Sequence, residues 1–259
     1  MDDVKIVIPA RHGSSRLPGK PLLDIAGKPM IVHVCERALE AGDAVFVATD
    51  DARIAAAVSD LPVTAVMTRA DHASGTERIA EVADRLGWPD ATRVVNLQGD
   101  EPLMQPQLIR QLAAALGDQD SAQMATLAAP IHDRAEAFDP HAVKVVLDRH
   151  GHALYFSRAP VPWHRDGFSQ PQAPLADSFP WLRHIGIYAY TAGFLRRYIN
   201  WPASQLESIE ALEQLRILWQ GERIRVLPVA SAPHAGVDTE ADLRRVMEIL
   251  NGGEVSRQV

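Results

Sequence analysis

The sequence has a single cysteine, Cys35, among its 259 residues. One cysteine excludes both a disulfide within the chain and a cluster of thiolate metal ligands. No apolar run is long enough to span a bilayer. The N-terminal Met1-Asp2-Asp3 lacks the basic start and apolar core of a signal peptide. We therefore expect a protein of the reducing cytoplasm without membrane insertion.

Several common sequence signatures are also missing. The chain has no Gly-x-Gly-x-x-Gly fingerprint and no P-loop, so two familiar phosphate-binding loops are excluded. It has neither His-Glu-x-x-His nor Gly-x-Ser-x-Gly, which argues against a zinc protease and a serine hydrolase. The formal net charge of -7 argues against a nucleic-acid partner, which normally requires a basic face.

Positive charge is instead concentrated in one loop near the N-terminus. Arg11, Arg16 and Lys20 lie between an apolar, β-branched run at residues 4–8 and helical periodicity at residues 30–39. In an α/β sheet, the loop after a strand lies where ligands bind. Three cations and open backbone amides suit a polyphosphate better than a neutral ligand. The alternative interpretation is an ordinary solvated surface loop.

The first half of the chain alternates apolar runs with helical patterns. The expected strands are residues 4–8, 44–49, 63–67 and 93–97, and the expected helices are 30–39, 51–58, about 74–86 and 105–116. This alternation predicts an α/β fold with a mostly parallel central sheet and helices on both faces. Because each polar motif follows a strand, we expect the motifs to converge at one edge of the sheet.

The second half changes character. Residues 158–181 contain five prolines and little periodicity, which predicts a long loop or lid. A helix over residues 208–219 is expected to bury Ile209 and Trp219 on one side, with Glu210 and Gln214 together on another. We expect a single domain over 1–259, with a core of residues 1–130, a smaller lobe of about 130–200, and residues 201–259 completing the core.

Two aspartates are candidates for cation binding. Asp100 follows the expected strand at 93–97, and Asp238 lies in a Gly-Val-Asp-Thr loop before the last helix. Two carboxylates on different loops suit magnesium that holds phosphate oxygens. Helix N-capping is an equally common role for aspartate at such positions, and spacing alone leaves both interpretations open.

Four long motifs carry a family resemblance. They are residues 9–21 (PARHGSSRLPGKP), 68–78 (TRADHASGTER), 96–102 (NLQGDEP) and 206–216 (LESIEALEQLR). In this order, and over about residues 5–247, the chain resembles the 3-deoxy-manno-octulosonate cytidylyltransferases, the CMP-Kdo synthetases. The resemblance implies an enzyme with a Rossmann-like nucleotidyltransferase fold, a nucleotide-binding core, and a homodimer formed through a sugar-binding lobe in the second half.

The same resemblance implies a reaction and a set of site residues. CTP and 3-deoxy-D-manno-octulosonate (Kdo) would give CMP-Kdo and diphosphate for lipopolysaccharide synthesis, with magnesium as cofactor. Arg11, Arg16 and Lys20 resemble the triphosphate-binding residues, and Asp100 and Asp238 the magnesium ligands. The positions resembling the cytidine site are Ala10, Ser74, Gly75 and Thr76. The positions resembling the sugar-acid pocket are Arg78, Gln98, Arg158, His184, Tyr188, Glu210 and Gln214.

Two alternatives remain open. A related sugar acid, either sialic acid or 8-amino-Kdo, is one, since a single pocket residue can discriminate one exocyclic group. The other is a non-catalytic nucleotide-sugar sensor on the same fold, which would bind nucleotide without releasing diphosphate. The presence of Lys20, Asp100 and Asp238 together argues against the sensor.

Overall fold

A computed structural model describes residues 4–13, 17–116, 122–170, 174–175 and 179–252. The chain divides into two compact units. The first contains Met1–Ala113, Thr191–Ile199 and Pro233–Val259, and the second contains Ala114–Tyr190 and Asn200–Ala232. These bounds differ from the expected 130 and 200, because the chain enters the second unit earlier and returns only briefly to the first at 191–199.

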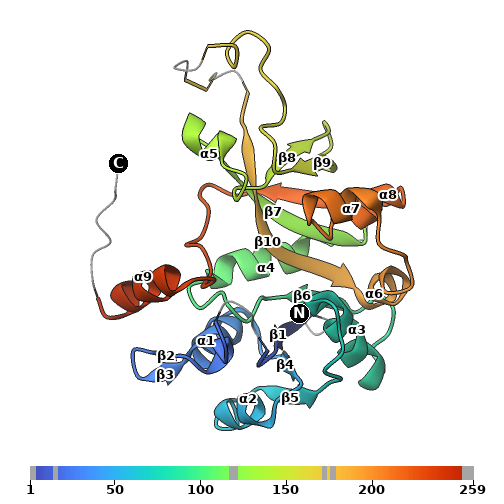
Figure 1. Cartoon of the computed structure of the whole chain (residues 1–259). Helices are drawn as coiled ribbons and strands as arrows, with labels where there is room; N and C mark the ends of the chain where they lie inside the picture. Colours follow the sequence, from blue (N-terminus) through green and yellow to red (C-terminus); the bar gives the residue numbers. More distant parts are fainter. Residues whose placement is uncertain (1–3, 14–16, 117–121, 171–173, 176–178, 253–259) are drawn as a thin grey trace. The chain divides into compact units, whose positions relative to one another are not determined.

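Four parallel strands form the sheet of the first unit (Figure 1). They are β1 (Val4–Ala10), β4 (Val45–Thr49), β5 (Thr64–Met67) and β6 (Arg93–Asn96), in the order β6-β1-β4-β5. Ile6 on β1 lies opposite Val45 on β4 and Val95 on β6. Ile6, Val7 and Ile8 are buried on successive positions, as expected for a strand covered on both faces.

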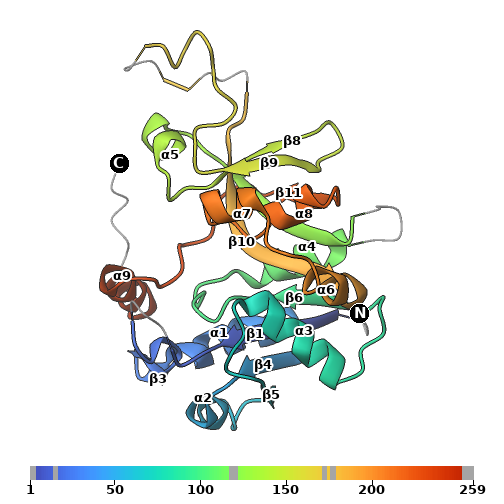
Figure 2. The same ribbon diagram turned by 45° about the vertical axis from the view of Figure 1, so that its right-hand side comes forward.

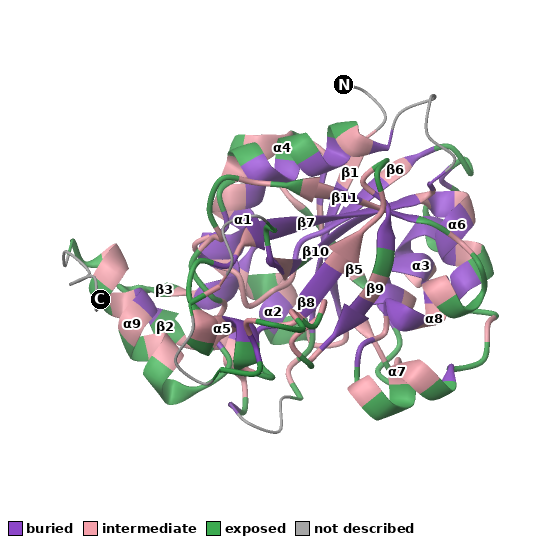
Figure 3. Ribbon diagram, turned by 90° about the horizontal axis from the view of Figure 1, so that it is seen from above, coloured by how far each residue is buried: buried purple, intermediate pink, exposed green. Residues whose placement is uncertain are grey.

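Helices cover both faces of these strands. The helices that follow the strands are α1 (Met30–Ala41), α2 (Ala52–Ala57) and α3 (Gly75–Arg85). Right-handed crossovers place α1 and α2 on one face and α3, which leads back to β6, on the other; Figure 3 shows α1 and α3 on opposite sides of the strands. The first unit also contains α6 (Ala192–Tyr198) and α9 (Glu240–Leu250).

The order of these strands determines where a ligand can bind. From β1 the chain moves outward to β4 and β5, and it then returns to β6 on the other side of β1. Loops at the carboxyl ends of the neighbouring strands β1 and β6 therefore lie at the same edge of the sheet, which is the edge where ligands bind in open α/β sheets. The cationic loop follows β1 and Asp100 follows β6, so both predicted motifs belong to this edge.

The second unit has a mixed sheet (Figure 2). Strand β7 (Met124–Pro130) pairs in parallel with β11 (Ile224–Pro228) and antiparallel with β10 (Leu182–Thr191). Strand β8 (Lys144–Leu147) pairs antiparallel with both β10 and β9 (Ala153–Ser157). With the parallel sheet of the first unit, this confirms the mixed α/β class and its mostly parallel centre.

The expected helix over residues 208–219 is wrong. The structure has two short helices, α7 (Gln205–Glu210) and α8 (Leu215–Trp219), separated by Ala211 in the left-handed conformation at φ 51°. A left-handed residue ends an α-helix because the next residues leave its axis. As a result Ile209 and Trp219 are exposed, and Glu210 and Gln214 do not share one helix face.

Other expectations are confirmed or extended. No described residue of 158–181 is in a helix or strand, and Phe168 and Trp181 from this segment bury against Ile131. The helix expected over residues 105–116 forms as α4 (Pro106–Ala115). The sequence analysis did not predict α5 (Arg134–Phe138) or the short hairpin of β2 (Asp24–Ile25) and β3 (Lys28–Pro29). No helix of the described residues has both the length and the apolar character needed to span a membrane.

The β2–β3 hairpin provides a test of local backbone strain. Ala26 and Gly27 form its two-residue turn with φ of 52° and 83°. Asparagine tolerates a positive φ better than alanine. Ala26→Asn should therefore raise the free energy of unfolding by about 0.5–1 kcal/mol in urea titrations. Ala56→Asn, within α2, should instead lower it by about 0.5 kcal/mol; destabilisation by Ala26→Asn would contradict the turn conformation.

Candidate active site

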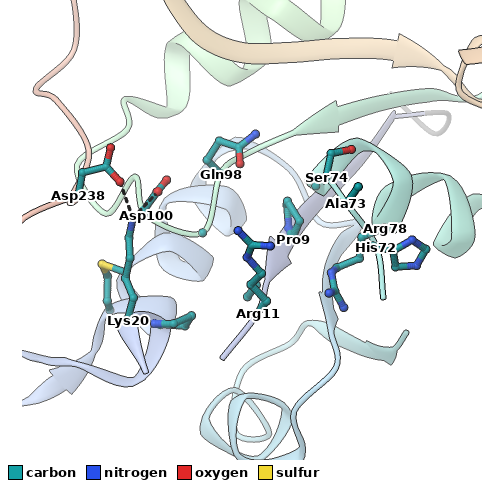
Figure 4. A pocket seen from close by; sticks show the side chains of 15 residues that line it. Pro9, Arg11, Lys20, His72, Ala73, Ser74, Arg78, Gln98, Asp100 and Asp238 are labelled. Carbon is teal, nitrogen blue, oxygen red and sulfur yellow. Dashed lines mark hydrogen bonds and ion pairs between the residues drawn. The ribbon is translucent and has the colours of Figure 1, made fainter. Parts of the chain in front are cut away.

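A pocket of about 260 Å³ lies at the carboxyl ends of β1 and β6, and all of its walls belong to the first unit. Four loops and the start of α3 form it (Figure 4). The lining residues are Pro9, Ala10, Arg11, Lys20, Pro21, Met30, His72, Ala73, Ser74, Gly75, Arg78, Gln98, Gly99, Asp100 and Asp238. Nine of the sequence-predicted site residues are among them.

Glycines allow the loops to approach one another. A Cβ atom on Gly99 would lie 2.9 Å from the carbonyl oxygen of Pro9, so the loops after β1 and β6 touch through backbone. A Cβ atom on Gly236 would likewise lie 2.9 Å from the carbonyl oxygen of Asp100. Val237, which is fully buried, donates its N–H to that same oxygen at 2.9 Å. These contacts bring Asp238 beside Asp100 despite their separation in sequence.

Lys20 lies between the two aspartates. Its Nζ is 2.6 Å from Oδ2 of Asp100 and 3.0 Å from Oδ1 of Asp238 (Figure 4). The Lys20 side chain is only 12% exposed. Burial alone would lower the pKa of Lys20, but the charges and hydrogen bonds of Asp100 and Asp238 outweigh it and raise that pKa above its ordinary value. The ammonium group is therefore charged at neutral pH.

The capping alternative for the two aspartates is answered by the helix starts. Thr239, not Asp238, is the N-cap of α9, where it forms a capping box with Asp242. Helix α4 begins at Pro106, too far along the chain for Asp100 to cap it. Both carboxylates instead point toward the same cation, so this part of the pocket is built to hold positive charge.

Arg11 is the other predicted cation of this loop that the structure describes. It is exposed and lines the pocket, toward which Figure 4 shows its side chain extending. Among the described residues no carboxylate lies within ion-pair distance of Arg11, so its charge remains available to an anionic ligand. Arg16 lies outside the described residues.

The segment before α3 forms the opposite wall. Ser74 accepts a hydrogen bond from the N–H of Glu77 and caps the helix. Carboxylates of α3 fix this segment: the N–H of Ala73 donates to Glu77 at 2.9 Å, and His72 Nε2 contacts Glu81. Ser74 and Gly75 line the pocket, whereas Thr76 is buried in the first turn of α3.

Two residues predicted for the sugar acid also lie in this pocket. Arg78 is 3% exposed, and its guanidinium donates to Oγ1 of Thr68 at 2.5 Å and to Oδ2 of Asp50 at 3.2 Å. Gln98 donates from Nε2 to Oδ1 of Asn96 at 3.1 Å, which leaves its Oε1 toward Gly75. The remaining five predicted residues belong to the second unit.

In the second unit, Glu210 and Arg158 form one hydrogen-bonded group. Oε1 of Glu210 accepts from Ser157 Oγ at 2.7 Å, and Oε2 accepts from the N–H of Arg158 at 2.9 Å. The guanidinium of Arg158 donates to two backbone carbonyls, those of Glu210 at 2.7 Å and Pro140 at 2.9 Å. The Arg158 guanidinium is thus held by the dipoles of two carbonyl groups. Among the described residues, no carboxylate lies within ion-pair distance of it.

His184, Tyr188 and Gln214 form a second group. A bulge inserts two residues of β10 between His184 and Tyr188, which oppose Ala128 and Thr126 of β7. An even insertion preserves the face, and the two rings lie 5.5 Å apart. Oε1 of Gln214 is 3.5 Å from the Tyr188 hydroxyl. Burial away from water lowers the pKa of His184 to about 3, so its imidazole is neutral at physiological pH.

The sequence of this chain is similar to those of known cytidylyltransferases. The family described as "Cytidylyltransferase" matches residues 5–224 of the chain. A 3-deoxy-manno-octulosonate cytidylyltransferase of Methylococcus capsulatus is 62% identical over 251 residues, which are 96% of this chain and 98% of the relative. The chain belongs to the cytidylyltransferase family. The enzyme of the same name from Yersinia enterocolitica is 58% identical, over 94% of this chain and 97% of its own length.

Solved structures agree with this membership. A CMP:2-keto-3-deoxy-manno-octonic acid synthetase complexed with CTP superposes with a TM-score of 0.86 at 46% identity, covering 96% of this chain and 98% of that chain. A cytidylyltransferase of Leptospira borgpetersenii, with a TM-score of 0.62 at 16% identity over 97% of this chain and 88% of that chain, shares the fold. The family expected from the four sequence motifs is therefore confirmed.

The structure also identifies residues that the sequence analysis passed over. His72, whose side chain is 5% exposed, holds the wall that carries Ser74. Lys144 is a fully buried lysine in β8 beside the Glu210 group. A lysine inside an apolar run, Val143-Lys144-Val145-Val146-Leu147, was the sequence signal that could have indicated it.

Close packing at Gly99 can be tested by substitution. In Gly99→Ala the new Cβ meets the backbone oxygen of Pro9, which cannot move as a side chain would. We expect a loss of about 1–3 kcal/mol in the free energy of unfolding, measured in urea. Gly13→Ala, where no described residue beyond the chain neighbours lies within 4 Å of the added Cβ, should cost much less; equal losses would contradict the close approach.

His184 predicts a pH dependence of stability. The unfolded chain protonates this histidine near pH 6.5, whereas the folded chain does so only near pH 3. Between these values the unfolded state binds more protons than the folded state. The free energy of unfolding therefore decreases as the pH is lowered, by at most about 1.4 kcal/mol per pH unit. His184→Gln should flatten this fall in urea titrations from pH 7 to 4. His132→Gln, at an exposed position, should keep the wild-type slope, and identical slopes for all three proteins would contradict the lowered pKa.

Proposed function

We propose that this chain transfers CMP from CTP to Kdo, giving CMP-Kdo and diphosphate for lipopolysaccharide synthesis. The observation that carries the proposal is the pocket at β1 and β6, where Arg11, Lys20, Asp100 and Asp238 converge. The names of relatives 62% and 58% identical over nearly the whole chain support it, as does the likeness to a structure bound to CTP.

Arg11 and Lys20 are suited to hold the triphosphate, together with Arg16. Arg11 faces the pocket without a carboxylate partner among the described residues, and its planar guanidinium pairs well with phosphate oxygens. Lys20 is charged, and a triphosphate offers it oxygens in place of the aspartates. Ala10, Ser74 and Gly75, which line the pocket, are assigned to the cytidine end, and a contact of the buried Thr76 with cytidine stays a prediction from the sequence.

Asp100 and Asp238 fit a magnesium ion. Both are carboxylates, the oxygen ligands that magnesium prefers, and both already face one cation, the Lys20 ammonium. When bound, magnesium would neutralise negative charge on the phosphate oxygens. The two aspartates would hold it. Lys20 and Arg11 counter charge that grows on the departing diphosphate, and this positioning contributes most of the rate in phosphoryl transfer.

The second-unit residues suit a sugar acid. Arg158 offers a charge without a carboxylate partner among the described residues, which suits the Kdo carboxylate. The buried Nε2 of Gln214 has no partner among the described residues and can donate to a sugar hydroxyl. His184 is neutral and adds no charge. We assign Tyr188 and Glu210 to the same substrate. The sugar-acid roles of Arg78 and Gln98, a homodimer and a cytoplasmic location stay predictions from the sequence.

Diphosphate release tests the proposal directly. The purified chain is incubated with CTP, Kdo and magnesium, and each component is omitted in turn. We expect diphosphate only from the complete mixture. Sialic acid and 8-amino-Kdo replace Kdo in parallel reactions. Turnover confined to either of these acids, or CTP binding without diphosphate release, would contradict the proposed substrate or the proposed catalysis.

Two substitutions separate binding from catalysis. Asp100→Asn keeps the shape but removes a charge, so kcat should fall roughly 100-fold or more while CTP affinity changes little. Lys20→Ala should also lower kcat strongly. Steady-state kinetics and equilibrium titration with CTP measure the two effects. Asp60→Asn, at an exposed position outside the pocket, should leave both unchanged; an unchanged kcat in Asp100→Asn and Lys20→Ala would contradict the assigned roles.

A further inference from the structure

Lys144 has an environment that is unusual for a lysine. It lies in β8 with no exposed surface, and its Nζ donates a 2.7 Å hydrogen bond to the backbone oxygen of Asp139. No carboxylate of the described residues lies within the 4.0 Å ion-pair distance. A buried charge without a partner at ion-pair distance costs free energy, and such residues are frequent at functional sites. Burial lowers the pKa of Lys144 accordingly.

The neighbours of Lys144 belong to the Glu210 group. On β9 the residue opposite Lys144 is Ser157, and directly opposite residues of antiparallel strands project to the same face. Ser157 donates to Glu210, whose carboxylate also accepts the N–H of Arg158. The carboxylates of Asp139, Glu210 and Glu136 and the guanidinium of Arg158 all act electrostatically on Lys144. Lys144 is therefore a buried neighbour of Glu210 and Arg158, the two residues assigned to the sugar acid, and is itself not exposed.

Lys144 and Arg158 both donate hydrogen bonds to the same short stretch of backbone, Asp139–Pro140. The carbonyl of Asp139 accepts from Lys144, and the next carbonyl, that of Pro140, accepts from Nη1 of Arg158 at 2.9 Å. Neither cation has a carboxylate at ion-pair distance among the described residues. Lys144 and Arg158 are thus held by consecutive carbonyls. Removing either positive charge would make the local potential more negative, so both charges favour an anion over a neutral ligand of the same shape.

We infer that Lys144 is a positioning residue for the sugar-acid substrate: it holds the Asp139–Pro140 turn that orients Arg158, and its charge makes the site selective for a carboxylate. The inference rests on the proposed function, because Arg158 is assigned to the Kdo carboxylate there. Lys144 does not touch the substrate and acts through Arg158 and through its electric field.

A purely structural role predicts different behaviour. Methionine has nearly the length of lysine and no charge, and replacement of a buried charge by an apolar side chain of similar volume is often neutral or stabilising. Lys144→Met should therefore fold with an unchanged or higher melting temperature. A structural lysine would lower the melting temperature and leave substrate discrimination as it was.

The experiment compares Kdo with its carboxamide, which has the same shape without the charge. In Lys144→Met we expect the KM for Kdo to rise tenfold or more, with the KM for CTP within twofold of wild type. The inhibition constant of the carboxamide should change less than threefold. The ratio of the carboxamide inhibition constant to the KM for Kdo should therefore decrease. Lys28→Met, an exposed lysine paired with Glu36 in the first unit, is the matched control and should retain wild-type constants.

A second variant tests the inference even if Lys144→Met does not fold. Lys144→Arg retains the charge, so it should preserve the preference for Kdo over the carboxamide even if its melting temperature falls. Loss of that preference in Lys144→Arg, or an unchanged KM for Kdo in folded Lys144→Met, would overturn the inference. Wild-type protein that releases no diphosphate from CTP and Kdo would instead refute the proposed function, so the two failures are distinguishable.

Discussion

The ion pairs of Lys20 with Asp100 and Asp238 join three distant parts of the chain. The partners are 80 and 218 residues from Lys20 in sequence, and they come from the loops after β1, after β6 and before α9. Two carboxylates this close repel each other unless a cation lies between them. Lys20 supplies that cation, and so it keeps the two carboxylates beside each other in the pocket.

Charge in the second unit is handled differently. There, Arg158 and Lys144 are held by backbone carbonyls, while the Glu210 carboxylate accepts from Ser157 and from a backbone N–H. Hydrogen bonds to dipoles fix the position of a charge without cancelling it. In the first unit Lys20 is therefore paired with two carboxylates, whereas in the second unit backbone oxygens hold Arg158 and Lys144.

Much of the first unit could be predicted from sequence. Buried parallel strands such as Val45–Thr49 read as short apolar runs, and the helix starts at Asp51 and Ser74 carry side chains that cap them. These signals are local, because strand burial and capping depend on neighbouring residues. The break at Ala211 was not predictable in this way, since alanine favours helix and rarely adopts the positive φ that it has here as the C-cap of α7.

The sequence by itself determined the α/β class, the cationic loop after the first strand and the family, because periodicity and contiguous motifs are properties of the chain. Only the tertiary structure decided that Asp238 meets Lys20, that Asp100 and Asp238 do not cap helices, and that Lys144 is buried beside Glu210. Contacts between residues far apart depend on how closely backbones approach, as at Gly99 and Gly236, and no local pattern records that distance.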